Sequence, residues 1–141
     1  MVIVDANVLL YASNTDSPHH ELARSWLDPA LTGGTGVGLP WVVLLAFLRI
    51  STHPRILPTP LSTAEAIDQV TSWLEAPAAV VVEPTSRHLS VLAGLVAQAR
   101  TGGNLVNDAH LAALAVERDA TIISFDRDFA RFPGVKHRLP A

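Results

Sequence analysis

Short runs of branched apolar residues, each ending at a polar or acidic position, predict the strands of this chain. The clearest runs cover residues 2–4, 79–83 and 121–124, and a shorter one at 135–139 is expected as a last strand. Helical spacing of apolar residues fills most of the sequence between them. Strands that alternate with helices favour parallel neighbours joined by right-handed crossovers. We therefore expect an α/β fold, a three-layer α/β/α sandwich with a short, mainly parallel sheet.

Helix boundaries follow from capping and helix-breaking residues. Ser62 and Glu65 form a capping box, and Pro29 is expected to end the helix before it. The segments 32–38 and 101–104 are rich in Gly and Thr and are expected as loops. Helices are predicted at 6–12, 18–27, 40–52, 62–75, 85–100 (capped by its first or second residue) and 105–119, with one helical turn at 126–132.

The composition is that of a globular chain. Its 141 residues are 49% apolar and 16% charged, which suits a single domain spanning 1–141 and argues against disorder. The absence of cysteine excludes a disulfide scaffold and a thiolate metal site. A net charge of −3 lacks the basic excess of a tight, non-specific nucleic-acid binder, although a local basic rim around an acidic site is compatible with it.

The N-terminus shows no secretion signal and no membrane segment. Its apolar run has no basic residues ahead of it and is interrupted by Asp5. The longest charge-free stretch, residues 29–48, contains two Pro and four Gly and is unsuited to a spanning helix. We expect a soluble, cytoplasmic protein without a membrane partner.

Three acidic residues come after predicted strands. Asp5 comes after the strand at 2–4, and Asp126 and Asp128 come after the strand at 121–124. Because parallel strands deliver their carboxyl ends to the same edge of a sheet, we expect these carboxylates to lie near one another. Ligands of open α/β sheets bind beyond this edge.

Asp108 adds a fourth carboxylate, in the first turn of the predicted helix 105–119 and on the same face as apolar residues. A buried charge is costly unless it is paired, and the sequence offers no obvious buried basic partner. A divalent cation is the simplest solution, and oxygen-only ligands suit Mg²⁺ or Mn²⁺. A metal held by carboxylates at a sheet edge fits phosphodiester hydrolysis, with a free carboxylate orienting the attacking water.

Each carboxylate also has a local structural interpretation. Asp5 is a favoured N-cap for the helix at 6–12, and Asp108 suits the positive end of its helix. Asp126 and Asp128 are common turn residues. The joint placement of the carboxylates at one edge favours the metal site over these separate roles.

Four blocks of sequence resemble the PIN domain, and more narrowly the VapC ribonuclease toxins of bacterial toxin–antitoxin pairs. They are VDANVLLYA at 4–12, LPWVVLLAFLRISTHPRI at 39–56, NDAHLAALA at 107–115 and ISFDRDF at 123–129. The resemblance implies a Mg²⁺- or Mn²⁺-dependent endoribonuclease that cuts structured cellular RNA such as tRNA or rRNA, leaving a 5′-phosphate and a 3′-hydroxyl. It also implies a homodimer that is silenced by a cognate antitoxin.

The resemblance assigns site residues by position. Asp5, Asp108 and Asp126 match the acidic metal ligands of the family, and Asp128 matches a weaker fourth acidic position; all four are expected to be catalytic.

Two further positions, Ser124 and Arg49, are assigned by the resemblance to the RNA side of the site. Arg49 is expected to clamp a phosphate, the alternative being a pair with one of the carboxylates.

Ala46 departs from the family pattern, which usually has Glu three residues before the Arg. A natural variant with fewer ligands, a weakened nuclease and an engineered inactivation all account for it. The missing carboxylate is expected to weaken metal binding, with Asp128 or a water taking over part of its role.

Other interpretations of the chain stay open or fail. A PIN-like module that binds RNA or antitoxin without cutting is the main alternative to the enzyme, and Ala46 is the residue that favours it. A phospho-accepting receiver domain is disfavoured, because Asp5 has no acidic neighbour and the strand order is wrong.

Several side chains have two interpretations each. Arg127 and Arg131 flank the last acidic motif and are either an RNA-binding rim or solvated surface. His110 is expected at the surface or in an interface, facing away from Asp108. Apolar residues beyond the needs of the core are candidates for a partner surface, namely Tyr11, Trp26 and Trp41.

Overall fold

A parallel sheet forms the middle layer of the computed structural model, which describes residues 1–99 and 104–141. Within these residues the sheet has five strands in the order β3-β2-β1-β4-β5, and every neighbouring pair is parallel. The strands are short, with two or three residues each. They are β1 (Val2–Val4), β2 (Val37–Gly38), β3 (Ala79–Val80), β4 (Thr121–Ile123) and β5 (His137–Arg138).

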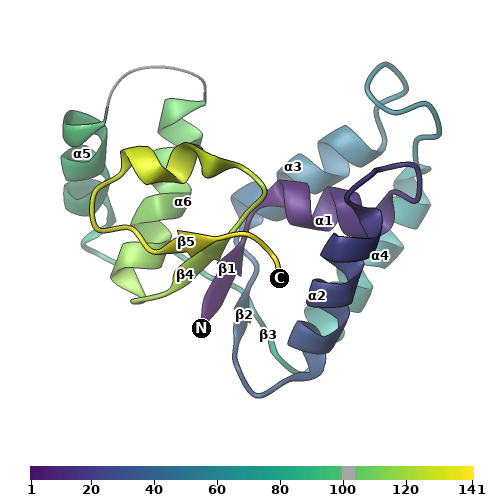
Figure 1. The fold of residues 1–141 in the computed structure, drawn as a ribbon, viewed down its shortest axis with the longest axis horizontal. Helices are drawn as coiled ribbons and strands as arrows, with labels where there is room; N and C mark the ends of the chain where they lie inside the picture. Colours follow the sequence, from purple (N-terminus) through teal and green to yellow (C-terminus); the bar gives the residue numbers. More distant parts are fainter. Residues whose placement is uncertain (100–103) are drawn as a thin grey trace.

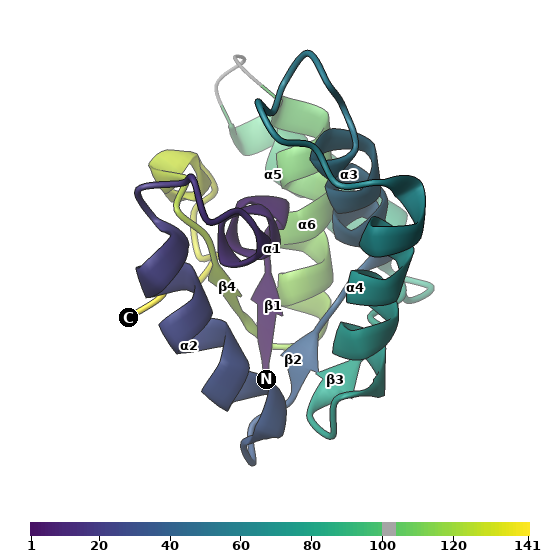
Figure 2. The ribbon, with the colours of Figure 1, turned by 90° about the vertical axis from the view of Figure 1, so that its right-hand side faces the viewer.

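Helices cover both faces of the sheet, as Figures 1 and 2 show. The first four helices lie on one face, and the last two lie on the other together with a short 3₁₀ helix, η1. This arrangement confirms the predicted three-layer sandwich. The elements are α1 (Ala6–Ser13), α2 (His20–Thr32), α3 (Trp41–Ser51), α4 (Thr63–Glu75), α5 (His88–Gln98), α6 (Leu105–Glu117) and η1 (Arg127–Arg131).

The order in which the strands are added to the sheet reverses between β1 and β4, which lie side by side. From β1 it passes outward through β2 to β3, and it then returns by α5 and α6 to place β4 on the other side of β1. Val4 at the end of β1 is opposite Ile123 at the end of β4. The crevice beyond these two strand ends is the point where open α/β sheets bind ligands.

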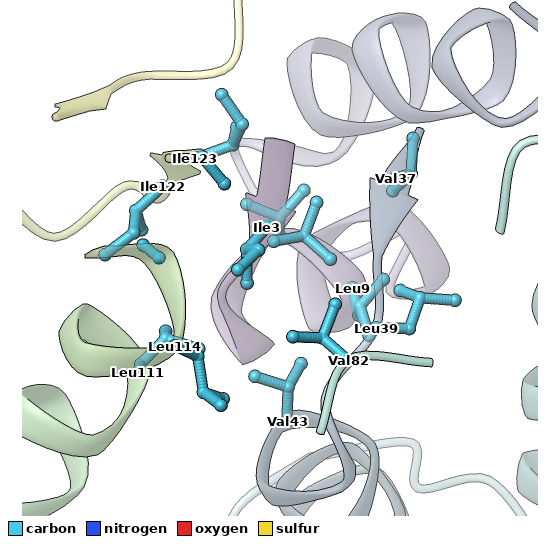
Figure 3. Close-up of a cluster of buried hydrophobic side chains, with 14 of the residues drawn as sticks. Ile3, Leu9, Val37, Leu39, Val43, Val82, Leu111, Leu114, Ile122 and Ile123 are labelled. Carbon is cyan, nitrogen blue, oxygen red and sulfur yellow. The ribbon is translucent and has the colours of Figure 1, made fainter. Parts of the chain in front are cut away.

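The core is made where helices of both layers meet the central strands (Figure 3). Ile3 in β1 is fully buried, as are Leu9 of α1 and Leu39 after β2. On the opposite face Leu111 and Leu114 of α6 are almost fully buried. The central strand is therefore enclosed on both faces, which explains its continuous apolar sequence.

Strand β2 lies in the segment 32–38 that was predicted as a loop, so that prediction is wrong at its end. A Cβ added at Gly38 would lie 2.6 Å from Cγ2 of Val82 and 2.9 Å from Cγ1 of Ile3. Glycine is present because the neighbouring strands leave no room for a side chain, and this use of glycine looks like a loop signal in the sequence.

The predicted end of the second helix before Pro29 is also wrong, since α2 continues through Pro29 to Thr32. Proline removes one backbone hydrogen bond, but Pro29 is exposed, so water can reach the carbonyl that it leaves free. The extra turn buries Leu31, and the carbonyl of Leu31 accepts a 3.0 Å hydrogen bond from the Ala78 N–H.

Most other boundaries agree with the sequence prediction. The capping box is confirmed, with Glu65 N donating to Ser62 Oγ at 3.1 Å and Ser62 N donating to Glu65 Oε1 at 2.8 Å. The third strand is shorter than predicted, and the last strand forms within the predicted segment.

Helix α5 begins at His88 rather than at the predicted cap. Thr85 lies three residues ahead of this helix, and its hydroxyl donates to Glu117 and accepts a 3.2 Å hydrogen bond from the Arg87 N–H. The predicted end of this helix at Arg100 and most of the predicted loop at 101–104 lie outside the described residues. Among the helices that the structure describes, none has the length and apolar character needed to cross a membrane.

Candidate active site

Asp5 sits at the crevice between the ends of β1 and β4. Its backbone N–H donates to the Ile123 carbonyl at 2.9 Å, so the ladder between the two strands fixes its position. Its Oδ1 accepts a 2.7 Å hydrogen bond from the Ala6 N–H, which makes it the N-cap of α1, and its Oδ2 accepts one of 2.8 Å from Ser124 Oγ. The capping role considered for Asp5 is therefore present, together with a place in the site.

Ser124 connects the two acidic segments. Its hydroxyl donates to Asp5 and accepts from Asn7 Nδ2 at 3.1 Å and from the Asp126 N–H at 2.9 Å. One donor and two acceptors are all that a hydroxyl has, so Ser124 is saturated by protein partners, and it is 3% exposed.

Asn7 is a residue of this site that sequence reasoning did not single out. Its amide nitrogen donates to Ser124, and its amide oxygen accepts a 3.1 Å hydrogen bond from the Phe125 N–H. It thereby holds the segment after β4 against the start of α1. The sequence signal was its place two residues after Asp5, but an asparagine in a first helical turn is common without such a role.

Asp126 and Asp128 follow β4 at the start of η1. Asp126 is half-buried and caps η1, with its Oδ1 accepting a 2.8 Å hydrogen bond from the Asp128 N–H. The side chain of Asp128 is exposed. The turn-forming role considered for this pair is thus present, and it leaves the second oxygen of Asp126 outside the capping bond.

Asp108 approaches from the other layer, in the first turn of α6. Its Oδ2 accepts a 2.9 Å hydrogen bond from Arg131 Nη2, and the two side chains are only 14% and 17% exposed. The prediction that Asp108 has no buried basic partner is therefore wrong, and so is the surface interpretation of Arg131. The two residues are 23 positions apart, and no local pattern relates them.

The carboxylates are close enough to change one another's ionisation. Burial raises the pKa of Asp5, and the charge of Asp126 adds to this against the hydrogen bonds from Ser124 and Ala6. For Asp108, burial and the charges of Asp5, Asp126 and Asp128 outweigh the opposing charge of Arg131 and raise the pKa to about 6. The site therefore holds more negative charge than its surroundings compensate.

A cleft of about 540 Å³ opens over Asp5 and Asp108, and the facing wall is formed by α3. Ala46 and Arg49 line this wall, one turn apart. Arg49 is exposed, and none of the ion pairs found among the described residues includes it. The structure thus places Arg49 in the same cleft as the carboxylates without the direct pairing considered for it.

Comparison with known proteins decides the family. Residues 2–135 match the PIN domain. The chain is 56% identical over 140 residues to ribonuclease VapC37 of Mycobacterium tuberculosis, an overlap of 99% of this chain and 97% of that protein. It is 43% identical over 140 residues to ribonuclease VapC33 of the same organism, with 99% and 98% covered. The chain belongs to the VapC family of PIN-domain proteins.

Solved structures of VapC proteins share the fold. A complex of VapBC2 from Rickettsia felis with promoter DNA contains a chain of TM-score 0.75 and 16% identity, covering 99% of this chain and 98% of that one. VapC20 of Mycobacterium tuberculosis, described as a Sarcin-Ricin loop cleaving toxin, has a TM-score of 0.70 and 16% identity, with 96% and 99% covered. At these identities the likeness concerns the fold.

The carboxylates of this VapC chain have the chemistry that a hard divalent cation needs. They offer only oxygen donors, and a bound cation would offset the burial and the mutual repulsion that together raise the pKa values of Asp5 and Asp108. As the side chains stand, no three His, Asp or Glu residues of the described chain are grouped tightly enough to hold an ion. Asp108 is turned onto Arg131 and Asp5 onto Ser124, so binding requires these side chains to reorient.

His110 lies on the same VapC helix as Asp108 but belongs to a separate network. Its Nδ1 lies 2.8 Å from Nε2 of His88, and Nδ1 of His88 lies 2.6 Å from Oε2 of Glu117, which has a buried side chain. Burial and the neighbouring His88 lower the pKa of His110. His110 is therefore not the surface residue that was considered, because its ring is half-buried and connects α6 to α5. Its separate network agrees with the prediction that it faces away from Asp108.

Proposed function

We propose that this chain is a divalent-metal-dependent endoribonuclease, the toxin of a type II toxin–antitoxin pair, which hydrolyses phosphodiester bonds of cellular RNA such as tRNA or rRNA. The observation that carries the proposal is the meeting of Asp5, Asp108 and Asp126 at the topological switch point, where burial and mutual charge raise the pKa values of the first two. Such an excess of negative charge is typical of a metal-dependent hydrolytic site.

Asp5, Asp108 and Asp126 would hold Mg²⁺ or Mn²⁺. The ion, when bound, lowers the pKa of a water and offsets charge on the phosphate. Asp128, exposed beside the other three, is suited to orient the attacking water and accept its proton. The water oxygen bonds to phosphorus as the bond to the 3′ oxygen breaks, which leaves a 5′-phosphate and a 3′-hydroxyl.

Arg49 is proposed to bind the phosphate from the α3 wall of the cleft, because its side chain is exposed there and free of carboxylate partners among the described residues. Ser124 was expected to contact RNA, but its hydroxyl has no hydrogen-bonding capacity left. We therefore assign Ser124 and Asn7 to positioning Asp5 and Asp126.

A module that binds RNA or antitoxin without cleavage is the second candidate. Ala46 favours it, since this residue lines the cleft facing Asp5 and Asp108 at the position where the resemblance places an acid. An alanine there gives the site one carboxylate fewer, and metal affinity depends on the number of charged ligands.

An antitoxin partner and a homodimer complete the proposal, with the cytoplasm as the location where cellular RNA is accessible. Several solved structures that share the fold are VapBC toxin–antitoxin complexes, which supports an antitoxin partner. Helix α3 also exposes large apolar side chains, with Trp41 46% and Leu45 58% exposed. Exposed apolar residues in one patch are typical of a protein interface.

The deciding experiment is incubation of the purified chain, free of antitoxin, with total RNA in Mg²⁺, Mn²⁺ or EDTA. Asp5→Asn is the matched variant, because its side-chain oxygen still accepts the Ala6 N–H and preserves the cap. Discrete cleavage that requires metal and is absent from the variant supports the enzyme. Cleavage that persists in EDTA and in Asp5→Asn contradicts the mechanism. Absence of cleavage by folded protein, unchanged in Ala46→Glu, supports the binding module.

A further inference from the structure

A second cleft, of about 320 Å³, opens beside Asp126. Asp126 and Ser124 line it on the side of the carboxylates, and three basic or titratable side chains line it as well, namely Arg127, His137 and Arg138. None of its lining residues belongs to the main cleft over Asp5 and Asp108. The two clefts are therefore separate, one with Asp5 and Asp108 in its lining and the other with Asp126.

The sheet register explains how the basic residues come together. Strand β5 runs parallel to β4, with Arg138 opposite Ile123, and the Ser124 N–H donates to the Arg138 carbonyl at 3.1 Å. Arg127 is the first residue of η1, directly after Asp126. Arg138 thus reaches the level of the site along the edge strand, while Arg127 reaches it from the turn that follows β4.

The guanidinium groups of Arg127 and Arg138 are available to a ligand. Both are exposed, and the ion pairs found among the described residues involve neither of them. One cleft thus has two guanidinium groups in its lining, in a chain whose net charge is −3. A guanidinium group binds the oxygens of a phosphate with two parallel hydrogen bonds, so this cleft suits a phosphate group.

We propose that the cleft formed by Arg127, His137 and Arg138 binds a backbone phosphate of the RNA strand, next to the phosphate that is cut. The inference rests on the proposed function, and it adds the direction in which the RNA strand leaves the carboxylates. An RNA strand is favoured over an acidic peptide because the cleft shares Ser124 and Asp126 with the catalytic edge, so one continuous chain of phosphates crosses both.

The test measures binding rather than cleavage. A fluorescent single-stranded RNA is titrated by anisotropy against the non-cleaving Asp5→Asn protein at several salt concentrations, and Arg127→Gln and Arg138→Gln are added to that background. Each variant is expected to bind more weakly and to reduce the slope of log affinity against log salt by about 0.7, the value for one phosphate contact on a single strand. Lysine at either position is expected to keep the slope, because the charge remains.

Arg87→Gln is the matched control. Arg87 is an exposed arginine directly before α5. Its neighbour His88 contacts Glu117 at the C-terminal end of α6, whereas Asp108 lies in the first turn of that helix. The Arg87→Gln variant is expected to leave affinity and slope unchanged. Circular dichroism melts confirm that each variant is folded.

Unchanged binding and slope in both arginine variants, with binding weakened by Arg49→Gln, would overturn the proposal while leaving the nuclease intact. Another result would also overturn it, in favour of an acidic protein segment as the ligand. In that result a Glu-rich peptide binds the parent protein but not the arginine variants, while the RNA affinity of these variants is unchanged. Absence of RNA binding and of cleavage by the unmodified chain is a different result, because it refutes the proposed function itself.

Discussion

The Asp108 carboxylate and the Arg131 guanidinium form an ion pair, with 2.9 Å between Oδ2 and Nη2, that joins the first turn of α6 to η1. Both side chains are largely buried, at 14% and 17% exposed. The pair gives Asp108 a cationic partner inside the protein, yet the pKa of Asp108 is still raised to about 6. Arg131 therefore offsets only part of the burial and negative charge that act on Asp108, and a metal ion bound at Asp108 would compete with Arg131 for the carboxylate.

Breaking this pair is expected to be costly. Arg131→Gln leaves the Asp108 carboxylate without its cation, and we expect the free energy of unfolding at pH 7.5 to fall by roughly 1–3 kcal/mol, between the values for exposed and buried pairs. Urea denaturation measures the change. The control is Lys136→Gln, which breaks the exposed pair of Lys136 with Asp119, 54% and 93% exposed, and is expected to cost less than about 1 kcal/mol.

A double-mutant cycle separates the pair from other contacts of Arg131. Asp108→Asn is combined with Arg131→Gln, and the coupling free energy reports the interaction between the two side chains. Additive effects of the two substitutions would contradict the interpretation of the pair as a significant interaction.

The raised pKa of Asp108 predicts how stability without metal depends on pH. The carboxyl ionises near its usual value of 3.8 in the unfolded chain but near 6 in the folded chain, so the folded state binds more protons between these values. The free energy of unfolding of the unmodified chain, taken relative to Asp108→Asn, is expected to fall as pH rises from about 4 to about 7. At 1.36 kcal/mol per pKa unit, the fall is at most about 3 kcal/mol.

Urea titrations in EDTA at several pH values measure this dependence. Added Mn²⁺ is expected to stabilise the protein more at pH 7.5 than at pH 5, because the carboxylates bind metal when ionised. A relative stability that is flat or rises with pH would show that Asp108 ionises normally in the folded protein.

The sequence predicts the acidic edge of the sheet because two of its carboxylates are placed by the strands that precede them. Asp5 and Asp126 each follow a strand, and parallel strands end at the same edge, so their meeting needs only the strand assignment. The pairing of Asp108 with Arg131 joins two layers across 23 positions, and no periodicity encodes it. Asn7 was missed for a similar reason, since its partners Ser124 and Phe125 are more than a hundred residues away.

Strand β1 was predicted from its apolar run, whereas its neighbour β2 was not recognised as a strand. Val2–Val4 is an unbroken β-branched run, in which Ile3 and Val4 are fully buried. Strand β2 consists of Val37 and Gly38 alone, and its glycine answers a steric need that only the neighbouring strands reveal. Its identity as a strand thus depends on tertiary packing rather than on local propensity.

Gly38→Ala tests that steric reason. The added Cβ would lie 2.6 Å from Val82 and 2.9 Å from Ile3, both in the buried core, so the sheet has to shift. We expect a loss of about 1–3 kcal/mol in the free energy of unfolding, typical of an overpacked core. Gly94→Ala is the control, because a Cβ at this position in α5 meets nothing within 4 Å and is expected to stabilise the helix by up to about 1 kcal/mol. Equal effects of the two substitutions would contradict the packing explanation.

Ala46→Glu tests whether the missing acid limits the metal site. Ala46 lines the cleft that contains Asp5 and Asp108, so a carboxylate introduced at this position reaches the same space. We expect Mn²⁺, followed by calorimetry, to bind about tenfold more tightly, equivalent to about 1.4 kcal/mol. Without metal, the added negative charge is expected to destabilise the protein at pH 7.5, since it faces carboxylates whose pKa values are already raised. Ala46→Gln has nearly the same size without the charge and is expected to show neither effect. Equal Mn²⁺ affinities of the Glu and Gln variants would show that Ala46 does not face the bound ion, and the reduced ligand set would then have to be the complete one for this protein.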